Sequence, residues 1–412
     1  MFFLLSLLNV LLYLINGKTA VIFSFISIII LYRRYKGGTL RIFLPIIIFT
    51  SAFYNINLVS NFSLMELCLI IYILIIFIST LYKNYRINIL VFLIALSSII
   101  FILIGVFLSQ DPIESFKNTL NLILFILVIL VTFLYVDNNP TIKKEEIHNY
   151  INMYLSVCIS LAIGLILQYL SFYVFNIKLG EIFTYSERTI FNLYFIPKST
   201  LSAFVCSGAI IMLIRLYKNF KFRSFIVFSL LLLANIINTS RTGLVVLILV
   251  FTLYVIMNTK YIYKNFKTFL LIFLLIISFF GASELLLEGR TSTALLDDNG
   301  RFDLIINSKE VIIDNLILGI GSSWPDLHKY GITMEIHNFV IQYLLQMGII
   351  VTISLLFLLF YILTKILYSE YFYVVLFVCL VGAFYTYWHN SLFINPIIII
   401  GIICSKRNYK LL

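Results

Sequence analysis

The stretch NILVFLIALSSIIFILIGVFL, residues 88–108, decides the class of fold. It is 21 residues long and contains no charged side chain. A helix rises about 1.5 Å per residue, so this stretch can cross the roughly 30 Å hydrocarbon core of a bilayer. No water at that depth can pair with the backbone, and a helix satisfies its own N–H and C=O groups. The stretch therefore predicts a transmembrane helix.

Comparable apolar runs recur along the whole chain of 412 residues. Hydrophobic residues make up 62% of the sequence and charged residues 11%, with a mean hydropathy of +1.07. These values exclude a soluble fold, in which about 25% of residues are charged, and the alternating strands of a membrane barrel are absent. We predict an all-α, polytopic membrane protein of about fourteen spans. They are expected near residues 2–16, 19–32, 42–58, 63–82, 88–108, 119–136, 150–171, 200–217, 224–238, 242–258, 268–287, 338–363, 372–388 and 392–405.

The first 32 residues allow two interpretations. Residues 1–16 carry no charged side chain, and no small-residue cleavage pattern occurs near Gly17. We therefore expect a retained helix and not a removed signal peptide. Two short spans are the first interpretation. One long tilted helix broken near Gly17 and Lys18 is the second, and it would give thirteen spans with the N-terminus outside.

Lysine and arginine are distributed unevenly over the loops between the spans. With the N-terminus inside, one side of the membrane holds 19 basic residues and four acids, and the other holds 10 basic residues and 14 acids. Cytoplasmic loops of membrane proteins carry an excess of basic residues. The net charge of +11 is thus explained by membrane topology, with both termini in the cytoplasm, and does not indicate nucleic-acid binding.

Three segments on the predicted outer side are longer than a tight turn: residues 109–118, 172–199 and 288–337. The last of these has the highest density of polar groups in the chain. Function in a membrane enzyme tends to lie in such loops. Within it, the apolar positions between Phe302 and Ile313 predict a short amphipathic helix.

Three groups of polar residues meet on the outer side in this topology. Arg241 lies in a short turn between two spans, Arg301 lies in the long loop, and His337 stands where that loop re-enters the membrane. A guanidinium group can grip a phosphate with two parallel hydrogen bonds. The start of a helix favours the neutral form of a histidine, which a general base requires. These three residues are the leading candidates for catalysis.

Each of these residues also has an ordinary structural interpretation. Arg241 could be a snorkelling anchor at the end of a span. Arg301 and Arg290 could be solvated loop charges balanced by nearby acids, and for Arg290 we prefer this interpretation. His337 could be an interfacial histidine without a chemical role.

Secondary candidates lie beside the leading ones. Glu335 is an alternative base or an orienting carboxylate, Asn338 follows the candidate histidine, and His389 repeats the His-Asn pair at another outer helix end. The four histidines show no HExxH spacing, and the five cysteines lie inside apolar runs without a CxxC pair. We therefore expect no metal and no cofactor.

The order of the motifs resembles the O-antigen polymerase and O-antigen ligase superfamily. The motifs are SRTG at 240–243, GRF at 300–302, LGIGSS at 318–323 and HNFVIQYLLQMGII at 337–350. The resemblance implies a metal-independent glycosyltransferase that uses polyprenyl-diphosphate-linked sugars at the outer leaflet of a bacterial inner membrane. It also implies that Arg241 and Arg301 contact the diphosphate.

The same resemblance implies a role and a division of the chain. His337 matches the candidate catalytic base of the family. Residues 1–224 would form N-terminal transmembrane helices, residues 225–365 the ligase- or polymerase-like core with the outer loop, and residues 366–412 the C-terminal transmembrane helices.

The leading functional prediction is a polymerase that joins oligosaccharide repeat units into O-antigen or capsular polysaccharide. Its partners would be polyprenyl-diphosphate-linked oligosaccharide and membrane lipid, with a chain-length regulator and a flippase in the same pathway. The nearest alternative is a ligase that transfers finished polymer to lipid A core. An alternative of another class is a transporter or flippase for lipid-linked oligosaccharide, which would be expected to bury ionisable residues in mid-membrane.

Overall fold

The computed structural model describes most of the chain as helix. The described residues are 1–35, 38–53, 57–59, 62–83, 88–139, 142–185, 188–194, 196–238, 241–258, 270, 274, 277–278, 301–332, 336, 338–382 and 393–405. In chain order the helices are α1 Phe2–Ile15, α2 Gly17–Arg34, α3 Thr39–Thr50, α4 Leu64–Lys83, α5 Ile89–Leu108, α6 Pro112–Asn138, α7 Lys144–Tyr173, α8 Lys198–Lys218, α9 Phe222–Ile237, α10 Arg241–Met257, α12 Arg301–Asp314, α13 Trp324–Lys329, α14 Phe339–Ile366, α15 Phe372–Gly382 and α16 Ile394–Cys404. A 3₁₀ turn at Ser51–Phe53 follows α3, and the strands are β1 Asn57–Val59, β2 Phe62–Ser63, β3 Glu181–Tyr185 and β4 Arg188–Asn192.

Several of these helices have the length and composition of membrane spans. Within the described residues, α5, α6, α7, α8 and α14 are each long and apolar enough to cross a bilayer, and shorter apolar helices accompany them. The prediction of a multi-pass helical membrane protein is therefore confirmed. The count of about fourteen spans stays a prediction, and the span expected at 268–287 lies almost wholly outside the described residues.

The N-terminal segment forms two separate helices. Asn16 adopts an extended backbone and its side chain accepts a hydrogen bond from the Lys18 N–H at 2.9 Å, so α1 ends and α2 begins anew. Asn9 of α1 donates to the Ser24 hydroxyl of α2 at 2.7 Å, which places the two helices side by side. A single tilted helix through Gly17 and Lys18 is therefore excluded.

The outer segment predicted at 109–118 is mostly helical, so that prediction is wrong. Asp111 caps α6 by accepting from the Glu114 N–H at 3.0 Å, and Pro112 occupies the first helical turn. Both are ordinary signals for the start of a helix. The polar composition of the segment predicts a loop, whereas its residues from Pro112 onwards form the first turns of α6.

The outer segment at 172–199 contains a β-hairpin that the sequence did not predict. Strands β3 and β4 pair antiparallel, with Glu181 opposite Asn192. The buried amide of Gln168, in α7, donates to the carbonyls of Leu179 and Asn192 at 3.1 and 3.2 Å. The hairpin therefore packs against α7. Tyr194, just beyond the hairpin, donates its hydroxyl to the side chain of Asn9 in α1 at 2.8 Å.

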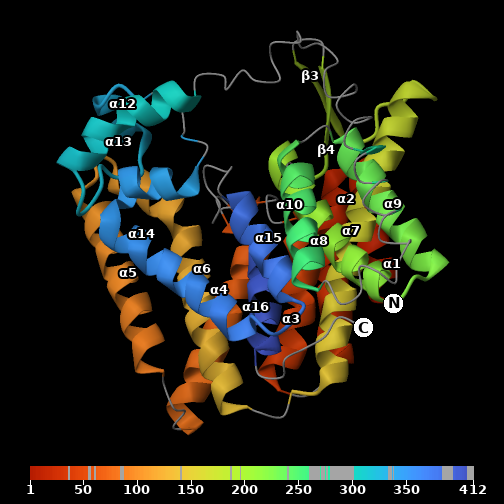
Figure 1. Ribbon diagram of the computed structural model, residues 1–412, viewed down its shortest axis with the longest axis horizontal. Helices are drawn as coiled ribbons and strands as arrows, with labels where there is room; N and C mark the ends of the chain where they lie inside the picture. Colours follow the sequence, from red (N-terminus) through yellow and green to blue (C-terminus); the bar gives the residue numbers. More distant parts are fainter. Residues whose placement is uncertain are drawn as a thin grey trace.

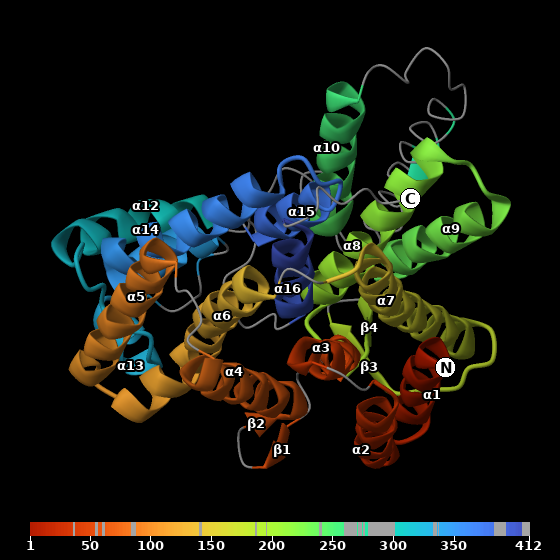
Figure 2. The same ribbon diagram turned by 90° about the horizontal axis from the view of Figure 1, so that it is seen from below.

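The helices pack around α16. All residues of α16 from Ile394 to Cys404 are buried, and it contacts α3, α6, α7, α14 and α15. Figure 2 shows it in the middle of the helices. A helix that is apolar on every side belongs in the interior of a bundle, and this explains the run of isoleucines. One hydrophobic cluster extends from α1 to α16.

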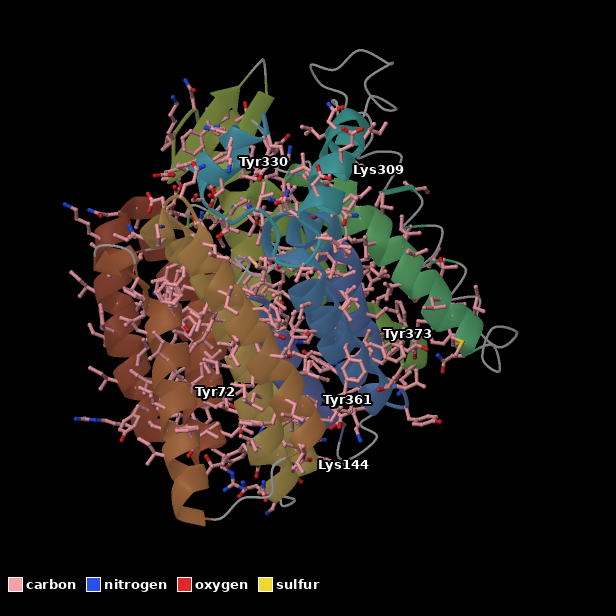
Figure 3. All side chains as sticks on the ribbon, turned by 90° about the vertical axis from the view of Figure 1, so that its left-hand side faces the viewer. Tyr72, Lys144, Lys309, Tyr330, Tyr361 and Tyr373 are labelled. Atoms are coloured by element: carbon pink, nitrogen blue, oxygen red, sulfur yellow. The ribbon has the colours of Figure 1, made fainter. Side chains whose placement is uncertain are left out.

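The two ends of the molecule carry different elements. Helices α12 and α13 and the β3–β4 hairpin occupy one end, which is uppermost in Figure 1. Figure 3 shows Lys309 and Tyr330 towards that end and Lys144 towards the other. Helix α12, which belongs to the long segment predicted to be outside, thus lies at the opposite end from Lys144.

Candidate functional site

Arg241 is the first residue of α10. Just before this helix, the Asn238 side chain donates to the Lys198 carbonyl at 2.6 Å, so the start of α10 lies beside the start of α8. Two residues after Arg241, a Cβ on Gly243 would come within 2.1 Å of the Ser202 hydroxyl. Glycine at this position therefore lets α10 approach α8 closely, and the close approach fixes the direction in which α10 begins.

Arg301 is likewise the first residue of a helix, α12. The N-terminus of a helix presents unpaired N–H groups and the positive end of the helix dipole, both of which favour an anion. The predicted amphipathic helix from Phe302 to Ile313 is confirmed by α12. The side chains of Arg241 and Arg301 lie outside the described part of the structure.

The residues on either side of His337 are held by hydrogen bonds. The Ile336 N–H donates to the Gln342 side chain at 2.9 Å. The Asn338 side chain caps α14 by accepting from the N–H groups of Val340 and Ile341 at 3.0 and 3.2 Å. The secondary candidate Asn338 therefore has a structural role as a helix cap. The chain is anchored immediately before and immediately after the candidate histidine.

The LGIGSS segment fills a break in α14. Gly348 has a φ of 75°, which interrupts the helix. The carbonyls of Leu345 and Gln346 near the break accept hydrogen bonds from Ile320 and Gly321 at 2.8 and 3.0 Å. The Ile349 N–H in turn donates to the Leu316 carbonyl at 2.8 Å. A broken membrane helix is tolerated where other groups pair with its freed backbone, and this segment supplies them.

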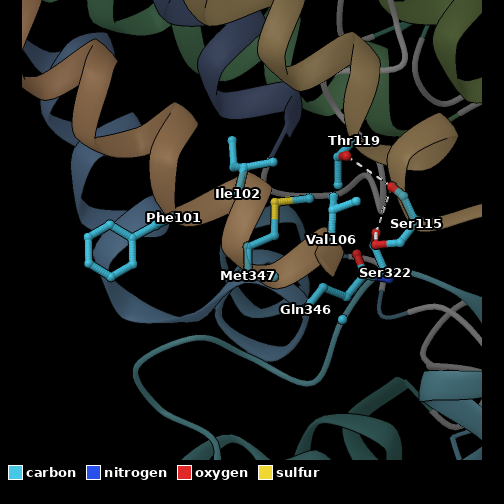
Figure 4. A pocket seen from close by; sticks show the side chains of 10 residues that line it. Phe101, Ile102, Val106, Ser115, Thr119, Ser322, Gln346 and Met347 are labelled. Carbon is cyan, nitrogen blue, oxygen red and sulfur yellow. Dashed lines mark hydrogen bonds between the residues drawn. The ribbon is translucent and has the colours of Figure 1, made fainter. Parts of the chain in front are cut away.

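Asp326 joins the same segment to the turn between α5 and α6. It is 3% exposed, and its carboxylate accepts from the Ser109 hydroxyl, the Gln110 N–H at 2.9 Å and the Ser323 hydroxyl at 2.6 Å. The hydroxyls of Ser115 and Ser322 are 2.8 Å apart beside a small cavity (Figure 4). These hydrogen bonds anchor the outer loop to the turn between α5 and α6.

The packing connects the two arginine-bearing helices indirectly. Helix α10 packs against α8 and α15, α15 packs against α14, and α14 packs against α12. That Arg241, Arg301 and His337 share one pocket stays a prediction, because the structure describes none of these three side chains. Arg290, Glu335, His337 and His389 lie outside the described residues altogether.

Three residues of this region were not recognised in the sequence: Asp326, Gln342 and Lys198. The first had a readable signal, because Ser323 and Asp326 form a capping box around Pro325 at the start of α13, which is a known helix-start pattern. Gln342 lies within an apolar span and gave no such signal. Lys198 is identified only by its backbone contact with the residue that precedes α10.

One family model matches the part of the chain that contains these residues. A family model described as O-antigen ligase matches residues 226–356. The match begins in α9 and ends in α14, so it includes the starts of α10 and α12, the LGIGSS segment and the cap of α14. The predicted resemblance to the O-antigen polymerase and ligase superfamily is confirmed over residues 226–356, and the match does not distinguish polymerase from ligase. No curated protein matches the chain significantly.

Proposed function

We propose, from the match of residues 226–356 to the O-antigen ligase family, that this membrane protein is an oligosaccharide repeat unit polymerase. It would join polyprenyl-diphosphate-linked repeat units into O-antigen or capsular polysaccharide at the outer leaflet of a bacterial inner membrane. In this proposal both termini lie in the cytoplasm and the LGIGSS end of the molecule faces outwards.

One structural observation supports this proposal above the others. Arg241 and Arg301 each begin a helix, and His337 directly precedes Asn338, the cap of a third helix. A guanidinium group at a helix N-terminus combines a bidentate phosphate ligand with the positive end of the dipole. Two such helix starts suit the two phosphates of a polyprenyl diphosphate.

The same residues can carry the chemistry of glycosyl transfer. As the bond between the anomeric carbon and the diphosphate oxygen breaks, negative charge develops on the leaving diphosphate. Arg241 and Arg301 would stabilise that charge, and a preorganised cation in a poorly hydrated site stabilises developing charge strongly. No nucleotide or metal needs to take part in this step.

The acceptor sugar hydroxyl is a weak nucleophile without a base. In this proposal His337 accepts its proton while the oxygen bonds to the anomeric carbon, and polyprenyl diphosphate leaves. The hydrogen bonds of Ile336 and Asn338 would hold the histidine in place for this transfer. Removal of a general base typically lowers the rate by about 10²–10⁴-fold.

Replacement of the histidine tests the proposed base. In a strain that lacks its own copy of the gene, His337→Ala should abolish the ladder of polymer lengths, whereas His328→Ala, at an exposed position of α13, should leave it unchanged. Membrane levels of both variants are measured to exclude loss of the protein. A ladder of normal length and amount from His337→Ala would disprove the role of His337.

Replacement of an arginine by lysine tests the diphosphate contact. Arg241→Lys keeps the charge and removes the planar fork, so turnover of purified lipid-linked donor should fall strongly. Arg223→Lys, at an exposed position near the start of α9, is the matched control. Equal turnover by the two variants would contradict the proposed contact.

The ligase alternative is supported by the description of the matching family model. A null mutant separates the two functions. Loss of a polymerase leaves single repeat units on the acceptor, whereas loss of a ligase leaves polymer on the carrier lipid. The transporter alternative is less well supported. Two charged residues are buried within the described part of the chain, Glu66 and Asp326. They lie in the first turns of α4 and α13 and not in mid-membrane.

A further inference from the structure

Helix α12 buries only one part of its apolar surface against the protein. Ile305, Val311 and Ile312 pack onto a small second core, which is separate from the main cluster of the transmembrane helices. That second core consists of Leu327, Ile332, Ile336 and Leu345. Ser308, on the same side of the helix, is 1% exposed. This side of α12 therefore faces α13 and the start of α14.

A second apolar stripe on α12 is exposed. Ile306, Ile313 and Ile317 are 65%, 59% and 61% exposed. Ile306 and Ile313 are seven residues apart, so they lie above one another on α12. Ile317 follows in the turn after the helix, which the Asn315 N–H closes by donating to the Val311 carbonyl at 3.2 Å. Three large exposed isoleucines so close together would be costly to leave in water, because apolar surface is stabilised by its removal from water.

The exposed stripe meets the lipid-facing surface of α14. Ile353, Phe357 and Phe360 are exposed at helical spacing on this candidate membrane span. The Leu316 carbonyl accepts from the Ile349 N–H at 2.8 Å. Ile349 lies one turn before Ile353, so the lower end of the α12 stripe joins the line of residues that α14 turns towards lipid.

The remaining side of α12 is polar. Asn307, Lys309, Glu310 and Asp314 are exposed. Asn307 and Asp314 directly follow Ile306 and Ile313 and lie about 100° further round the helix than the stripe. The helix thus has one side towards the protein core, one exposed apolar side and one side suited to water. A helix with this division lies in the plane of a membrane interface, with its apolar side inserted among the lipids.

We propose that α12 is an interfacial helix of the outer leaflet, with Ile306, Ile313 and Ile317 inserted into the lipid. The occupant of the stripe is lipid and not a second protein, because the stripe continues into the lipid-facing line of α14. One consequence rests on the proposed function: Arg301 then lies at the depth of the lipid headgroups, where the diphosphate of a polyprenyl carrier also lies.

Fluorescence quenching tests the position of α12 directly. A single cysteine is introduced at Ile313 or, as matched control, at exposed Asn307 on the polar side, and is labelled with the dye NBD. The labelled protein is reconstituted into phosphatidylethanolamine–phosphatidylglycerol nanodiscs. Of the native cysteines, Cys68, Cys158, Cys206 and Cys404 are buried and Cys379 is half-buried, so background labelling is measured on the parent protein. NBD at position 313 should be quenched several-fold more by nitroxide-labelled lipid than NBD at position 307, and the order should reverse with aqueous iodide.

Two results would overturn the proposal. Equal quenching of the two positions by iodide would show that the stripe faces water. Protection of position 313 from both quenchers would show that protein covers it. The readout needs no substrate, so it is independent of the proposed function. An unchanged polymer ladder in a strain that lacks the gene would contradict the function and leave the quenching pattern unchanged, whereas a water-exposed position 313 would contradict the interfacial helix alone.

Discussion

The break in α14 gives a prediction whose size can be estimated from the structure. Gly348 has a φ of 75°, and a Cβ built on it would lie 2.1 Å from the Ile317 carbonyl oxygen. The obstacle is backbone, which cannot rotate away as a side chain could. Gly348→Ala must therefore displace the segment that follows α12 or straighten α14.

The loss of stability has two parts. The backbone of Gly348, with φ 75° and ψ −179°, has a conformation that essentially only glycine adopts, and it costs another residue about 1–3 kcal/mol. Displacement of the segment breaks the hydrogen bonds that Ile349, Ile320 and Gly321 make across the break, and each contributes about 1 kcal/mol. Together the two parts lower the free energy of unfolding by about 4–6 kcal/mol.

A second glycine separates these two parts. Gly331 has a φ of 71°, and a Cβ built on it would meet nothing within 4 Å. Gly331→Ala should therefore cost only the conformational part, about 1–2 kcal/mol. The free energy of unfolding of both variants and the parent is measured by titration with sodium dodecyl sulfate in mixed micelles. If Gly348→Ala is no less stable than Gly331→Ala, the backbone contact across the break does not stabilise the protein as described.

Two further predictions concern the chain next to the candidate histidine and the outer hairpin. Gln342→Leu removes the acceptor of a buried N–H group, so kcat with lipid-linked donor should fall about tenfold or more because the loss of such a partner costs about 1–3 kcal/mol. KM should change little, and the neighbouring Ile341→Leu should match the parent in both values. Burial raises the pKa of the Glu181 carboxyl above its ordinary value. Folding therefore favours the protonated carboxyl, and this contribution to the free energy of unfolding is lost as the pH rises through the raised pKa. Glu181→Gln should therefore have the stability of the parent near pH 4 and exceed it at about pH 7 in thermal unfolding; the opposite order at neutral pH would contradict this assignment.

The apolar runs were sufficient to predict the class of fold and the position of most helices. In a bilayer every spanning segment must pair its own backbone groups, so composition and length alone indicate a helix such as α5. The amphipathic spacing from Phe302 to Ile313 likewise predicted α12, because its period depends on local geometry. The motifs also predicted the resemblance to the O-antigen ligase family, since all four lie within the matched residues 226–356.

The tertiary structure decided what those local rules leave open. The β3–β4 hairpin depends on Gln168, whose single amide pairs with carbonyls more than ten residues away. The break at Gly348 depends on backbone groups supplied by the LGIGSS segment, and the burial of Asp326 depends on Ser109, 217 residues earlier. Hydrophobic periodicity determines which surface of a segment is apolar, and this information is contained in the sequence. Which distant group pairs with a buried donor, acceptor or charge is settled only when the helices pack, because the energy of that contact exists only after folding.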